Sequence, residues 1–168
     1  MGLAVIFNIG ILALILLAAW HDVASRTIPD TISLLVLVFG TLLRSQEGPS
    51  ALALSAATSL LLFTVLLIAF SRRLIGGGDV KIMTAAAVGL SPLDCYRFVI
   101  ATTIAGGFLA ITYLVLSRTL TGLPARRTSL FGRVAAIESW RIRRCGSIPY
   151  GVAIAAGGAF VLLLPRSS

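Results

Sequence analysis

Asp22 and Asp79 are the two residues of this sequence whose type and position could do chemistry together. Each is an ionisable side chain at the border of an apolar stretch, where a charge is costly and marks a candidate functional site. Two carboxyls held close together cannot both ionise easily, and such a pair can hydrolyse a peptide bond. One carboxyl takes a proton from the attacking water while the other protonates the carbonyl oxygen. We therefore expect Asp22 and Asp79 to meet in a two-carboxylate hydrolytic site at a membrane face.

Three consecutive glycines, residues 76–78, stand directly before Asp79. Glycine is a poor helix former, so this segment is predicted to break the chain between two apolar stretches. In the catalytic interpretation, a backbone without Cβ at Gly76 and Gly78 approaches an extended substrate closely and shifts as Asp79 moves toward Asp22. The alternative is a flexible loop in which Asp79 caps the following helix. A second acidic segment beside the membrane favours the catalytic interpretation.

Pro29, Asp30 and Lys81 are the remaining residues that we expect to support the site. Pro29 is typical of a helix start, and Asp30 then falls in a first turn, where the helix dipole favours negative charge. By the same reasoning Asp79 is predicted to be the ionised member of the pair, because it begins a helix and Lys81 follows two residues later. Asp22 follows a helix C-terminus and is expected to hold the shared proton.

The composition predicts an integral membrane protein. Hydrophobic residues make up 58% of the chain and charged residues only 12%, and the mean hydropathy is +1.01. The net charge of +8 would suggest nucleic-acid binding in a soluble protein. Here the basic residues are better explained by the excess of Lys and Arg in cytoplasmic loops, so no nucleic-acid partner is expected. Cys95, Cys145 and His21 form no metal-binding pattern, and no metal or cofactor is predicted.

Six apolar segments predict an all-α, polytopic membrane protein with one membrane-embedded domain over residues 1–168. These segments are residues 3–20, 28–43, 51–70, 79 or 80 to about 89–92, 98–116 and 148–164. The second and fourth segments are shorter than the roughly 20 residues that a full crossing needs. Because each follows a segment that carries an acidic residue, the short spans predict a water-accessible depression over the site. No Lys or Arg precedes the first segment, so we expect a retained span rather than a signal peptide.

Charge bias predicts the orientation in the membrane. The connections after the first, third and fifth spans carry eleven of the fourteen Lys and Arg residues. The positive-inside rule therefore places these connections in the cytoplasm and both termini outside. Asp22 and Asp79 then lie on the same, cytoplasmic face, which supports pairing them.

The longest connection, residues 118–147, contains half of the basic residues and a helically spaced apolar stripe. This pattern is typical of an amphipathic helix at the membrane surface, and a solvated basic loop is the alternative. The residues of the stripe are Leu130, Val134, Ile137 and Trp140.

Four segments occur in a characteristic order. They are Asp22 after the first span, Ile28-Pro29, a GxGD motif that continues as Gly-Asp-Val-Lys at residues 78–81, and Ile148-Pro149-Tyr150-Gly151 before the last span. In this order the chain resembles the type IV prepilin peptidases, which are GxGD membrane aspartic proteases. It is most similar to the short form found with tight-adherence (Flp-type) pilus systems, and the resemblance covers nearly the whole chain.

The resemblance implies an endopeptidase of the bacterial inner membrane. Such an enzyme removes the short, positively charged leader of prepilins or pseudopilins at the cytoplasmic membrane face, with Asp22 and Asp79 as its catalytic pair. Its partners are the prepilin substrate and membrane lipid. Larger relatives carry a methyltransferase region with paired CxxC motifs, which this chain lacks, so N-methylation is not expected.

One departure from the family pattern is Asp30, where the family usually has Asn. A third carboxyl here either changes the proton affinity of the pair or caps the second helix, and we favour the cap. Two other functions stay open. A presenilin-like GxGD protease usually has a Tyr-Asp motif that is absent here, and a small transporter or assembly protein could use membrane acids to carry ions.

Overall fold

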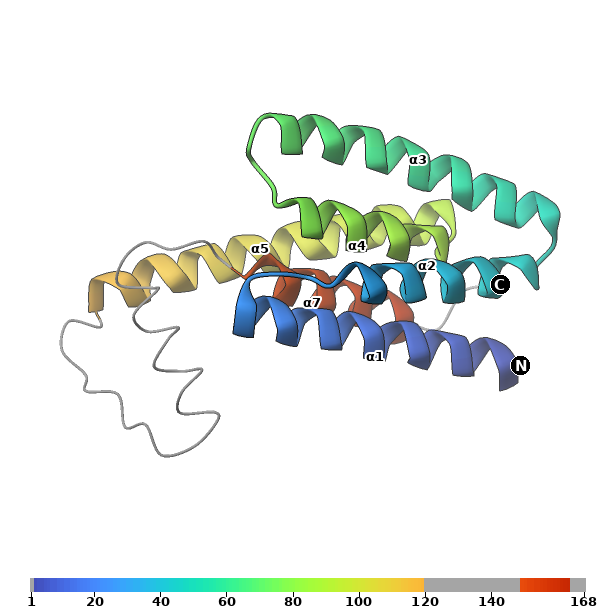
Figure 1. Ribbon diagram of the computed structural model, residues 1–168, viewed down its shortest axis with the longest axis horizontal. Helices are drawn as coiled ribbons and strands as arrows, with labels where there is room; N and C mark the ends of the chain where they lie inside the picture. Colours follow the sequence, from blue (N-terminus) through green and yellow to red (C-terminus); the bar gives the residue numbers. More distant parts are fainter. Residues whose placement is uncertain (1, 120–148, 164–168) are drawn as a thin grey trace.

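The computed structural model describes residues 2–119 and 149–163, and this part of the chain folds into six helices without a strand (Figure 1). They are α1 (Gly2–Ser25), α2 (Asp30–Ser45), α3 (Pro49–Ser71), α4 (Gly77–Val88), α5 (Pro92–Thr119) and α7 (Tyr150–Leu163). The predicted all-α membrane fold is confirmed. The amphipathic helix predicted within residues 118–147 lies almost wholly outside the described residues.

Helix length separates the bundle into long and short members. Within residues 2–119 and 149–163, three helices are long and apolar enough to cross a membrane: α1, α3 and the first 24 residues of α5. In contrast, α2 has 16 residues and α4 has 12, about 24 and 18 Å of helix against a bilayer core of about 30 Å. The prediction that the second and fourth segments are short is therefore confirmed. With 14 residues, α7 is also short.

One predicted helix end, that of α1, and one predicted helix start, that of α5, were wrong. α1 continues through Asp22 to Ser25, whereas the sequence predicts that the first span ends at residue 20 and that Asp22 follows the helix. Polarity alone does not end a helix: no glycine or proline interrupts this segment, and the Arg26 N–H still bonds to the Asp22 carbonyl oxygen at 2.9 Å. Asp22 therefore projects from a helix rather than from a loop.

α5 begins at Pro92 rather than near residue 98. Its first turn is stabilised by a reciprocal cap, in which the Asp94 N–H donates to Ser91 Oγ at 3.1 Å and Ser91 Oγ donates to the Asp94 carboxylate at 2.8 Å. Pro92 suits the first helical position because its missing N–H has no partner there. Residues 94–97, which lie between the predicted fourth and fifth segments, are thus helical.

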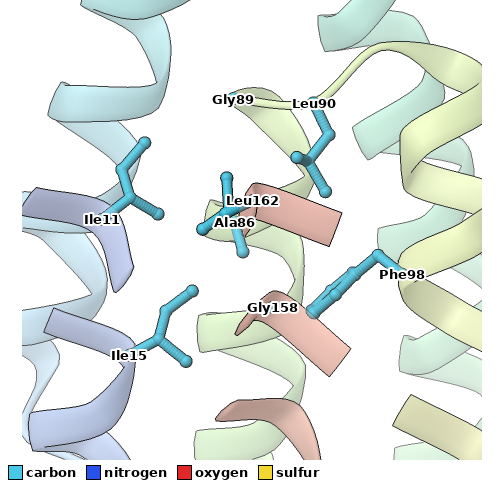
Figure 2. Close-up of a pocket in the computed structure, with 8 residues that line it drawn as sticks. All are labelled: Ile11, Ile15, Ala86, Gly89, Leu90, Phe98, Gly158 and Leu162. Atoms are coloured by element: carbon cyan, nitrogen blue, oxygen red, sulfur yellow. The ribbon is translucent and has the colours of Figure 1, made fainter. Parts of the chain in front are cut away.

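Helix packing positions the ends that carry the acidic residues. α4 packs against both α2 and α3, while α7 packs against both α1 and α5, and α1 also contacts α2 (Figure 1). Figure 2 shows a small pocket between α1, α4, α5 and α7. Its lining is entirely apolar and includes Ile11, Ile15 and Phe98.

A buried polar network joins three segments at the end remote from Asp22. Arg44 is only 6% exposed, and its Nε donates to Ser55 Oγ at 2.8 Å. Ser55 in turn donates to the Leu90 carbonyl oxygen at 2.8 Å, and Arg44 also pairs with Glu47. Because a buried donor without an acceptor is costly, this network holds the end of α2, the start of α3 and the segment after α4 together.

Replacing Ser55 with Ala should therefore destabilise the protein. The change removes the acceptor of the buried Arg44 Nε, and we expect it to lower the free energy of unfolding by about 1–3 kcal/mol. Thr58→Ala is the matched control, since Thr58 is only partly buried on the same helix and its hydroxyl donates to the Leu54 carbonyl oxygen of that helix. Unfolding in SDS titrations would measure both. Equal losses for the two variants would contradict a stabilising role of the network.

Candidate active site

Asp22 and Asp79 line the same pocket at one end of the bundle. Asp22 lies near the C-terminal end of α1 and Asp79 lies in the first turn of α4, and these two helix ends lie at the same end of the molecule (Figure 1). The charge of Asp22 also acts on the Asp79 carboxyl. The structure thus brings together the two acids that the sequence predicts to meet.

The pocket is open to solvent and has both charged and apolar walls. Its void, including the open part, is about 1920 Å³. Besides the two aspartates, the lining comes from the residue after α1, the end of α3, the α3–α4 connection and the start of α7. These residues are Arg26, Phe70, Ser71, Arg73, Leu74, Ile75, Gly76 and Tyr150.

Asp22 is fixed by the first turn of α7. Its side chain is buried, at 8% exposure, and Oδ2 accepts a hydrogen bond of 2.8 Å from the Gly151 backbone N–H. An N–H at a helix start has no partner within its own helix, so it is free to bind a carboxylate. A Cβ on residue 151 would lie 2.9 Å from the Asp22 Cβ, which leaves room for glycine only. In the sequence, Gly151 stands out only as part of the segment Ile148-Pro149-Tyr150-Gly151 on which the family resemblance rests. The sequence did not predict that its N–H binds Asp22.

The positions of the two aspartates at helix ends do not distinguish which one is ionised. Asp79 lies at the positive end of its own helix and accepts a backbone hydrogen bond from Gly76, as predicted for a stabilised charge. Asp22, however, faces the positive end of α7 and accepts the Gly151 N–H. Both carboxyls therefore have one backbone donor and a favourable helix end.

The glycines before Asp79 serve close packing. α4 starts at Gly77, so Gly77 and Gly78 are helical, and the predicted break is limited to the segment that ends at Gly76. None of the three has a positive φ. A Cβ on Gly77 or Gly78 would lie 3.3 Å from the nearest side-chain atom, of Phe70 and of Ile28 respectively. These glycines thus allow the start of α4 to approach its neighbours, rather than providing an unusual backbone conformation.

Lys81 and Asp30 pair with each other outside the pocket. Lys81 Nζ lies 2.8 Å from Asp30 Oδ1, and both side chains are exposed. The sequence predicts that Lys81 supports the charge of Asp79. In the structure Lys81 instead forms an ion pair with Asp30, which joins α4 to α2. Asp30 does lie in the first turn of α2, with Pro29 as the N-cap residue, but its carboxylate binds Lys81. An exposed pair of this kind contributes about 0–1 kcal/mol.

Replacing Gly151 with Ala should displace the carboxylate of Asp22. The added methyl group overlaps the Asp22 side chain, and we expect a loss of about 1–3 kcal/mol in the free energy of unfolding. Gly107→Ala is the control, because a Cβ on this α5 residue meets no atom within 4 Å. The control should be at least as stable as the unchanged protein. A Gly151→Ala protein as stable as the control would contradict the contact.

A comparison of the sequence with known protein families identifies the family of this chain. A sequence profile of the type IV leader peptidase family matches residues 9–111, a stretch that contains both aspartates of the pocket. No curated protein and no solved structure gives a significant match. Because the matched stretch covers more than half of the chain, this protein belongs to the type IV leader peptidase family.

Proposed function

We propose that this protein is a membrane aspartic endopeptidase that removes the positively charged leader of type IV prepilins or pseudopilins, in particular of Flp-like ones. The observation that carries the proposal is the shared pocket of Asp22 and Asp79. A peptidase family whose members act on leader peptides, together with two acids facing one solvent-open pocket, supports an aspartic mechanism over the transport of ions.

The proposed reaction needs only these two carboxyls and one water. A peptide enters the pocket in an extended form, and the ionised carboxyl takes a proton from water as the oxygen attacks the scissile carbonyl carbon. The protonated carboxyl gives its proton to the carbonyl oxygen, so a neutral tetrahedral diol forms. The C–N bond then breaks as the leaving nitrogen takes a proton from the carboxyl that became protonated. One hydroxyl of the diol returns its proton to the other carboxyl, which restores the pair.

The proposed orientation places the pocket at the cytoplasmic face of the bacterial inner membrane, with both termini on the other side. The pocket end carries Arg26, Arg72 and Arg73 around the ends of α1 and α3. Arg44 lies near the C-terminal end of α2 and Arg97 lies near the N-terminal end of α5. Both of these helix ends are at the other end of the bundle (Figure 1). This distribution agrees with the excess of basic residues on the cytoplasmic side.

The two-aspartate mechanism predicts that neither acid can be replaced by its amide. Asp22→Asn and Asp79→Asn should each lower the cleavage rate of a co-expressed Flp-type prepilin at least about a thousandfold, because residues that act as a unit fail together. Leader removal is measured by the mass of the pilin, and purified variants are compared by thermal unfolding to check that they fold.

Asp30→Asn is the matched control, since this exposed carboxylate pairs with Lys81 outside the pocket. We expect its cleavage rate to stay within about threefold of the unchanged protein, because only an exposed ion pair is lost. Substantial cleavage by the Asp22→Asn or the Asp79→Asn protein would contradict the proposed function.

A further inference from the structure

Tyr150 is a pocket residue to which the two-aspartate mechanism gives no task. It is the first residue of α7 and lines the same pocket as Asp22 and Asp79. Pro149, whose side chain is fully buried, precedes it, and Gly151, whose N–H binds Asp22, follows it. The backbone of Tyr150 is therefore held on both sides by contacts that also position the acids.

The ring of Tyr150 is held by α5. A Cβ on Gly106 would lie 2.6 Å from Cε2 of the Tyr150 ring and 3.2 Å from its hydroxyl oxygen. Real Cβ atoms do not approach other atoms as closely as 2.6 Å, so glycine at position 106 is what admits the ring in this orientation. Packing of α5 against α7 thus fixes the phenol relative to the pocket.

The hydroxyl of Tyr150 is placed for a ligand. Tyr150 lines the pocket together with Asp79, while the backbone of the next residue binds Asp22. Ser71 carries the other hydroxyl in the pocket lining, but it donates to the Ile68 carbonyl oxygen of its own helix at 2.8 Å. Among the described residues, Tyr150 Oη has no hydrogen-bond acceptor, so its donor is available to a molecule in the pocket.

We infer that Tyr150 is a substrate-binding residue whose hydroxyl donates a hydrogen bond to a backbone carbonyl of the peptide lying between Asp22 and Asp79. An extended peptide presents such carbonyls along its length, and a neutral donor beside two acids binds one without adding charge. This inference rests on the proposed function and assigns a residue outside the stretch matched by the family profile.

The experiment measures binding separately from cleavage. The probe is a fluorescent peptide that contains the basic leader of a Flp-type prepilin and the first residues after the leader, and the protein carries Asp79→Asn to prevent cleavage. In this background Tyr150→Phe keeps the ring against Gly106 and removes only the hydroxyl. The dissociation constant should rise about 3- to 10-fold, as expected for one hydrogen bond, while the thermal midpoint stays unchanged.

Two further variants serve as controls for the loss of the ring and for the loss of a hydroxyl elsewhere. Tyr150→Ala removes the ring as well and should lower the thermal midpoint, which separates packing from hydrogen bonding. Tyr96→Phe removes an exposed hydroxyl of α5 and should leave the dissociation constant unchanged. In protein that retains Asp79, Tyr150→Phe should raise KM by the factor seen in binding and leave kcat within about twofold.

The inference is overturned if Tyr150→Phe binds the peptide as tightly as its parent, if it lowers the thermal midpoint as Tyr150→Ala does, or if it lowers kcat at unchanged KM. Failure of the peptide to bind the parent Asp79→Asn protein would overturn it as well, together with the proposed substrate. Cleavage by the Asp79→Asn protein would instead contradict the proposed mechanism alone, and the binding constants would still judge Tyr150.

Discussion

The hydrogen bond between the Gly151 N–H and Asp22 Oδ2 is the interaction on which the site depends. A carboxylate as buried as Asp22 is costly unless it is satisfied, and a free N–H at the start of a helix is a suitable partner. This bond joins the first described helix to the last one and determines where α7 begins relative to α1. Tyr150 and the pocket wall that it forms follow from the same contact.

Asp79 is held by a different set of neighbours. α4 is packed between α2 and α3, and the glycines at its start let it approach Phe70 and Ile28. At its other end, the Leu90 carbonyl oxygen belongs to the buried network of Arg44 and Ser55. Each aspartate is thus positioned by its own helices, and the pocket forms where these two groups of helices meet.

Hydropathy and charge are local signals, and they predicted the helical fold, the short α2 and α4, and the presence of Asp22 and Asp79 at one end. What the sequence could not show depends on contacts between distant segments. The Gly151 N–H can bind Asp22 only because α7 packs against α1. Likewise, Lys81 pairs with Asp30 rather than with its neighbour Asp79 because α4 packs on α2. Helix ends were missed where polarity was taken for a break, as at Asp22 and Asp94.

We propose that Asp22 and Asp79 act as one pair, and a double variant tests this proposal. Single-turnover cleavage of a Flp-type prepilin peptide would be measured for Asp22→Asn, for Asp79→Asn and for the protein with both changes. If the carboxyls act together, the double variant is as slow as the slower single variant, because the second change removes nothing that still works. Losses that multiply in the double variant would show two independent contributions and contradict a shared mechanism.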